Sequence, residues 1–188
     1  MRFDSGSLRA FPRRSARPLP PLALVGEGIL AGLAGTAAMT LGQTRLLPRL
    51  PIPEGPQPRR KPEYPEESVA RREPTTETAA RRIASGLAHR PLTPRQRKIA
   101  GNVLHFAFGG TWGALLALLG RRPTVPQGLL FGAAVWMISD NGLLPLLRLG
   151  SWPNRYPPGV HAKALLAHLI YGAGTAWTLR RLMPAQRC

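Results

Sequence analysis

The chain of 188 residues contains little of the chemistry on which enzymes and disulfide-stabilised folds depend. Its one cysteine is Cys188, so no disulfide can form within the chain. It has no HExxH or CxxC motif, no Walker loop, no nucleophile elbow and no GxGxxG sequence. These absences remove support for a zinc hydrolase, a nucleotide-binding protein or an α/β-hydrolase. We therefore expect no enzymatic activity and no cofactor.

Acidic residues are also scarce, at 9 against 26 Lys and Arg, which gives a formal net charge of +17. Six of the nine acids lie in residues 48–99, where they alternate with twelve basic residues. This dilution argues against a nucleic-acid partner. The other basic residues mostly flank apolar runs, where anionic lipid headgroups are the expected partner.

What the chain does have is four long apolar runs, at about residues 22–47, 100–119, 125–147 and 159–179. A hydrocarbon core about 30 Å thick requires about 20 helical residues, and each run is of that length. The fold class predicted is all-α, an integral membrane four-helix bundle at residues 21–183. The expected surroundings are the lipid bilayer of a cell membrane, crossed by several spans.

The ends of the chain and residues 48–99 are polar. The composition of residues 1–20 predicts a disordered basic tail. Residues 184–188 are expected to form a short C-terminal tail. The first apolar run is longer than the core of a usual signal peptide and contains Glu27, so we expect it to be retained.

The segment between the first two spans is expected to be partly helical. Residues 48–62 are a Pro-rich linker, and a short helix is predicted from Pro65. A second helix fits residues 75–89, with Ala79, Ile83 and Leu87 on one stripe. That helix would lie on the membrane surface or pack on the end of the bundle. Thr93 is predicted to cap the second span, with Pro94 in its first turn.

Each span contains two small residues four positions apart, a spacing that lets helix backbones approach closely. The pairs are Gly28 and Gly32, Gly109 and Gly113, Gly128 and Gly132, and Gly172 and Ala176. Pairs in all four spans favour one compact bundle. Self-association through an unused small-residue face is an alternative use of the same residues.

Ionisable residues within a span usually face a partner or a cavity, because they are expensive to place in lipid. Counting residues from the span ends places one polar group of each span at about the same depth, roughly 9–14 Å below one surface. These four are Gln43, His105, Asp140 and His168. Accessory candidates are Glu27, in the opposite half, and Asn102, Asn141 and His161.

This cluster has three interpretations. Asp140 and one histidine can satisfy each other and fix the helix register. An acid–imidazole cluster can also relay protons or handle ions. Two imidazoles and a carboxylate can hold a divalent metal, although no ligand-spacing motif supports one.

Several stretches of the chain resemble a known family. They are residues 28–40, residues 132–136 with Ser139, Asp140, Asn141 and Pro145, Tyr156 with Pro157, and residues 167–172. They are similar to the YagU-like bacterial inner-membrane proteins, a family of unknown function (DUF1440). The resemblance implies a small inner-membrane protein linked to acid or envelope stress, and it supplies no mechanism. Asn141 stands where family members often have a second acid, which argues against a paired carboxylate.

The sequence thus predicts a multi-pass membrane protein without assigning its molecular function. One alternative is a small transporter or proton-handling protein that uses the Asp/His cluster. The other is a structural or partner-binding membrane protein. Basic residues close to the spans are nearly equal in number on the two sides, so they set no orientation.

A direct test of the fold class is extraction. We expect the chain to stay in the membrane pellet after an alkaline carbonate wash and ultracentrifugation, because four apolar helices hold it in lipid. Recovery in the aqueous fraction without detergent would contradict the predicted class.

Overall fold

The computed structural model describes residues 20–53, 55, 74–87, 89, 91–119 and 122–183. Within these residues every regular element is a helix or a helical turn. The longest are α1 (Pro21–Leu41), α4 (Pro94–Leu118), α5 (Val125–Ile138) and α7 (Pro158–Leu182), and α3 (Thr75–Leu87) is shorter. The helix predicted from Pro65 and both predicted tails lie outside the described residues, apart from Pro20.

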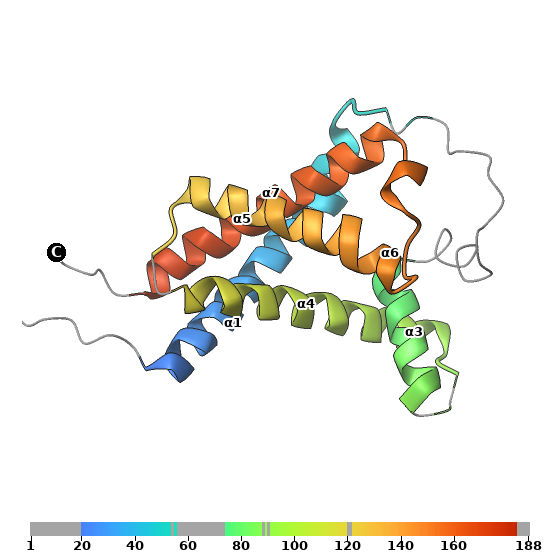
Figure 1. Cartoon of the computed structure of the whole chain (residues 1–188), viewed down its shortest axis with the longest axis horizontal. Coiled ribbons are helices and arrows are strands. Elements are labelled where there is room, and N and C mark those ends of the chain that lie inside the picture. The colour runs from blue at the N-terminus through green and yellow to red at the C-terminus, as the bar shows by residue number, and fades with distance from the viewer. Residues whose placement is uncertain are drawn as a thin grey trace, which may run out of the picture.

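The helices α4 and α5 run roughly along the length of the molecule, and α1 and α7 cross them at an inclination (Figure 1). The start of α1, the connection from α4 to α5 and the end of α7 lie at one end of the molecule, with α3 and α6 at the other. Arg122, in the connection, donates a hydrogen bond to the carbonyl of Arg180 near the end of α7. The described helices therefore alternate in direction, as successive membrane spans would.

Local sequence explains where the helices begin. Thr93 and Thr124 cap α4 and α5, and each exchanges hydrogen bonds with the glutamine three residues later, Gln96 or Gln127. Pro158 occupies the first turn of α7, where its missing N–H is not needed. The predicted cap at Thr93 and the predicted start of the fourth apolar helix are confirmed.

Two of the apolar segments do not continue as ideal α-helices. After Leu41 the chain forms a π-helical segment, η1 (Gly42–Leu46), and then a 3₁₀ turn, η2 (Leu47–Arg49). After Ile138 it forms a second π-helical segment, η3 (Ser139–Leu143), and then α6 (Leu144–Leu146). The apolar run predicted at about residues 125–147 is therefore helical from Val125 to Leu146, with a π-helical segment inside it. Such π-helical segments are frequent at functional sites.

Glycines set the distance between the packed helices. A methyl group on Gly32 of α1 would meet the backbone of Gly109 and Gly110 on α4. A methyl group on Gly172 of α7 would meet the backbone of Gly128 and Gly132 on α5. The small pairs predicted from the sequence thus lie at the helix crossings, where the two backbones touch.

The pair α1 and α4 is built like the pair α5 and α7. Gly28 and Gly32 of α1 occupy the place that Gly128 and Gly132 hold on α5. On α4, the row of residues that faces α1 is Gly109, Gly113 and Ala117, spaced by four. On α7, the corresponding row that faces α5 is His168, Gly172 and Ala176. A π-helical segment follows both α1 and α5. We call these two helix pairs hairpins. They differ in the residue at one corresponding position, where the α5–α7 hairpin has His168 and the α1–α4 hairpin has Gly109.

A third crossing joins the hairpins, since α1 also packs against α7. Gly35 lies against Thr175 and the carbonyl of Tyr171, and the Tyr171 hydroxyl donates a 2.7 Å hydrogen bond to the carbonyl of Gly109. Thr36 and Thr175 are fully buried here and donate to carbonyls of their own helices. The centre of the bundle therefore has hydroxyl groups, each paired with a backbone oxygen.

The helix α3 packs against the beginning of α4, where Glu77 lies over Gly101. Its buried positions are Thr78 and Ala80, while Ile83 is 48% exposed. The predicted apolar stripe is therefore not the face that α3 buries, because the absence of a side chain at Gly101 draws the Glu77 and Thr78 face toward α4.

The packing makes a specific prediction for glycine substitutions. We expect Gly172→Ala to lower the midpoint of thermal unfolding in detergent, because the added methyl group forces α5 and α7 apart. Overpacking of this kind costs about 1–3 kcal/mol. The matched control is Gly26→Ala on α1, where a methyl group would meet nothing within 4 Å. Equal midpoints for the two variants would contradict the close contact of α5 and α7.

Candidate functional site

The structure brings Asp140 and His168 together. Asp140 lies in the π-helical segment η3 and His168 in the middle of α7, and the distance from Asp140 Oδ1 to His168 Nε2 is 3.7 Å. The side chain of His168 is 11% exposed and that of Asp140 is 31% exposed. Asp140 is therefore the more exposed partner of the pair, and His168 is the more buried one.

Hydrogen bonding fixes one proton on His168. Its Nδ1 lies 2.9 Å from the carbonyl oxygen of Ala164, one turn earlier on α7. A carbonyl oxygen only accepts, so Nδ1 carries a proton and donates it. Nε2 then has either a lone pair or a second proton, and it is this atom that faces Asp140. One further proton can thus be bound either by His168 Nε2 or by the Asp140 carboxylate, which are 3.7 Å apart.

His161, an accessory candidate two turns earlier on α7, is a further member of the site. Its Nε2 donates a 2.8 Å hydrogen bond to the carbonyl of Pro153, and its ring meets Trp136 and Tyr156 edge-on. It also interacts electrostatically with Asp140. Because Nε2 is used as a donor, Nδ1 is the atom with which His161 can accept a proton.

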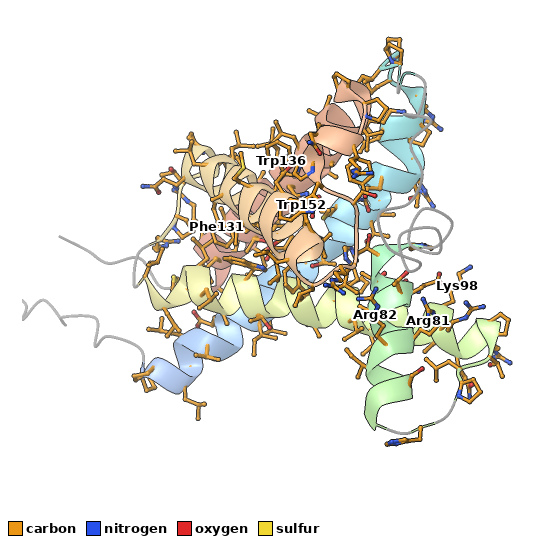
Figure 2. All side chains as sticks on the ribbon, turned by 45° about the vertical axis from the view of Figure 1, so that its right-hand side comes forward. Arg81, Arg82, Lys98, Phe131, Trp136 and Trp152 are labelled. Carbon is orange, nitrogen blue, oxygen red and sulfur yellow. The ribbon has the colours of Figure 1, made fainter. Side chains whose placement is uncertain are left out.

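Asp140 and His161 line a cavity of about 200 Å³ at the end of the bundle near α6. Its wall also includes Trp136, Asn141 and Tyr156, and Figure 2 shows Trp136 beside α7. Trp136 Nε1 is buried and makes no hydrogen bond within the described structure. A cavity of this size whose wall includes these polar groups can hold several waters.

The remaining predicted residues lie as follows. His105 on α4 is partly buried and interacts electrostatically with His168. Asn141 donates a 3.3 Å hydrogen bond to the carbonyl of Trp136, a contact within η3 and the end of α5. Asn102 is exposed on α4.

Gln43 does not join the cluster. It is exposed on η1 and makes no hydrogen bond to the other described members of the predicted layer. The prediction placed Gln43 by its depth along the helix, and depth does not fix the side of the helix on which a residue lies. Glu27 lies at the other end of α1, with Oε2 buried and unpaired in the described structure. Within the described part of the chain, no three His, Cys, Asp or Glu residues are close enough together to hold a metal ion.

Sequence reasoning missed how α3 closes this end of the molecule. Thr75, at the start of α3, lines the cavity together with Asp140. Arg82 donates hydrogen bonds of 2.8 and 2.7 Å to the carbonyls of Leu147 and Arg148, just after α6 (Figure 2). Arg148 has a positive φ of 54°. No spacing in the sequence signals this contact, because the partners are 65 and 66 residues apart.

Comparisons with known proteins identify no relative: no family model, no curated protein and no solved structure matches the chain. Function is therefore inferred from the geometry of the site.

The contact of Arg82 predicts how accessible the cavity is. In a chain with Cys188→Ser and Asn141→Cys, we expect Arg82→Ala to increase the rate of maleimide labelling several-fold. Loss of two hydrogen bonds from a charged donor frees α3 and its Thr75 from the cavity wall. The matched control is Arg95→Ala, on the exposed first turn of α4. Identical labelling with and without Arg82 would show that α3 does not cover the cavity.

Proposed function

We propose that this protein is a four-span membrane protein that binds and releases protons at the Asp140–His168 pair. Two continuous helical segments, Pro21–Arg49 and Val125–Leu146, are long and apolar enough to cross a membrane by length and composition. Only 33% and 22% of their apolar windows are buried inside the molecule. A core helix of a water-soluble protein would be mostly buried, so this exposure supports lipid as the surrounding medium.

The helices α4 and α7 complete the proposed set of spans. Each has 25 residues, which is about 37 Å of α-helix. Polar residues lower their hydropathy, among them Asn102 and His105 on α4 and Lys163 and His168 on α7. Of the two histidines, His168 contacts Asp140 and His105 interacts electrostatically with His168. Lys163 lies in the second turn of α7, where a long side chain can reach the headgroups. The family resemblance adds the bacterial inner membrane as the proposed location.

The observation that carries the proton-handling proposal is the contact of Asp140 with His168 Nε2 while Nδ1 donates to Ala164. With one shared proton the pair is neutral overall, as imidazolium and carboxylate or as imidazole and carboxylic acid. With two protons its charge is +1, and with none it is −1. A low-dielectric site penalises both charged states, so the pair gains or loses a proton only when pH or a neighbouring charge changes enough.

Access supports the same proposal. Asp140 borders the cavity, and His161 Nδ1 is a second proton acceptor on its wall. Further along α7, on the side of His168 away from the cavity, the hydroxyls of Tyr171 and Thr175 donate hydrogen bonds to backbone carbonyls. The arrangement therefore favours exchange of protons with one face, which suits a response to acid. The stress link implied by the family resemblance agrees with this use.

Infrared spectroscopy of the full chain in lipid vesicles tests the proposal. Across a pH series, we expect a carboxylic-acid C=O band that changes with pH and that Asp140→Asn abolishes. His168→Gln should shift the pH at which the band changes, because it removes the group that shares the proton. Glu27→Gln is the matched control, since it neutralises the other acid at membrane depth, and it should retain the band.

The alternative use of the pair is purely structural. In that case Asp140→Asn would lower the unfolding midpoint and leave the pH-dependent spectrum unchanged. That result would overturn proton handling. A pyranine assay in vesicles then separates net proton transport from local binding, because only transport acidifies the lumen.

A further inference from the structure

We propose that the groove between α3 and α4 binds an anionic phospholipid, with one acyl chain along α4 and the headgroup beside Arg95. The groove has a volume of about 530 Å³ and lies on the outer surface of the molecule. Its walls include Ile83 of α3, Leu92, and Ile99, Val103 and Leu104 of α4, and Gln96 is the one polar residue among those that line it.

The groove is open to the surroundings of the protein. Ile83, Ile99 and Val103 are 48%, 54% and 62% exposed, so the described residues leave much of its apolar surface uncovered. Ala80, in contrast, is only 4% exposed and forms part of the groove wall that α3 buries against α4. An uncovered apolar surface of this kind marks a place where another apolar molecule binds.

The residues of α4 give the groove a direction. Arg95, Ile99 and Val103 are spaced by four and so form one row along the helix surface. The row begins with an exposed cation in the first turn and continues as apolar side chains toward the middle of the proposed span. A phospholipid has the same order, with an anionic headgroup followed by an acyl chain, and each basic residue near the headgroups contributes about 1 kcal/mol.

The dimensions favour an acyl chain over a helix of a second protein. The lining residues of α4 extend from Gln96 to Leu104, which is about 12 Å at 1.5 Å per residue. A volume of about 530 Å³ over that length corresponds to a cross-section of about 44 Å². A helix 10–12 Å in diameter has a cross-section of about 80 Å² or more, so most of it would lie outside the groove, whereas a single acyl chain is narrow enough to lie within it.

The inference rests on the proposed membrane location and is independent of proton handling at Asp140. Native mass spectrometry of the full chain in detergent tests it, with phosphatidylglycerol and phosphatidylcholine of identical acyl chains added in parallel. We expect phosphatidylglycerol to be retained preferentially. Val103→Trp, which fills the groove, should abolish retention of both lipids. Leu130→Trp is the matched control on α5, where the parent leucine is 73% exposed, and it should leave retention unchanged.

Charge is tested separately from shape. Arg95→Gln should reduce the preference for phosphatidylglycerol about fivefold, the factor that corresponds to about 1 kcal/mol. Arg49→Gln makes the same charge change at an exposed site after α1 and should have no effect. Equal retention of both lipids by the unaltered chain would overturn the proposal, as would unchanged binding in Val103→Trp. Displacement of the lipid by inorganic phosphate alone would show that the occupant is a free anion and would overturn the acyl-chain assignment.

Discussion

Close contact of helix backbones at glycine is the constraint on which this structure depends. At the proposed membrane location, apolar side chains gain little by leaving lipid for a helix interface, so packing at short range would hold the helices together. Gly28 and Gly32 provide this contact for α1 and α4, and Gly128 and Gly132 provide it for α5 and α7. Because the backbones touch, there is little freedom in the relative position of the helices. That rigidity is what fixes the distance between η3 and α7, and with it the distance between Asp140 and His168.

The candidate site depends on an irregular helical segment, η3, that is held by these packed helices. Asp140 is part of a π-helical segment, and His168 takes the place that the other hairpin gives to Gly109. The backbones meet at this level in both pairs, at Gly32 and at Gly132 of the facing helices, and His168 adds a titratable group there. Asp140 and His168 of the proposed site therefore both belong to the α5–α7 half of the molecule.

Features set by local sequence could be predicted, and features set by distant contacts could not. The cap at Thr93 and the start of α7 at Pro158 depend on a few neighbouring residues, and both predictions are confirmed. The meeting of Asp140 with His168 was accessible as well, because counting residues along each helix placed both at one depth. Depth alone does not give the direction of a side chain, so it could not show that Gln43 is exposed on η1. The contact of Arg82 with the carbonyls after α6 and the cavity at Asp140 bring together segments that are distant in the chain, and no pattern in the sequence records them.

The lengths of the two most apolar segments have a consequence for the bilayer. Pro21–Arg49 has 29 residues and Val125–Leu146 has 22, which correspond to about 44 and 33 Å of helix. If the two segments span one bilayer as proposed, the longer one has to tilt more to fit the same hydrocarbon thickness. A thinner membrane would increase that tilt and pull on the glycine crossings that α1 makes with α4 and α7. At the proposed location, bilayer thickness would therefore act on the packing of the helices, and the protein would be sorted toward membranes whose thickness matches its longer span.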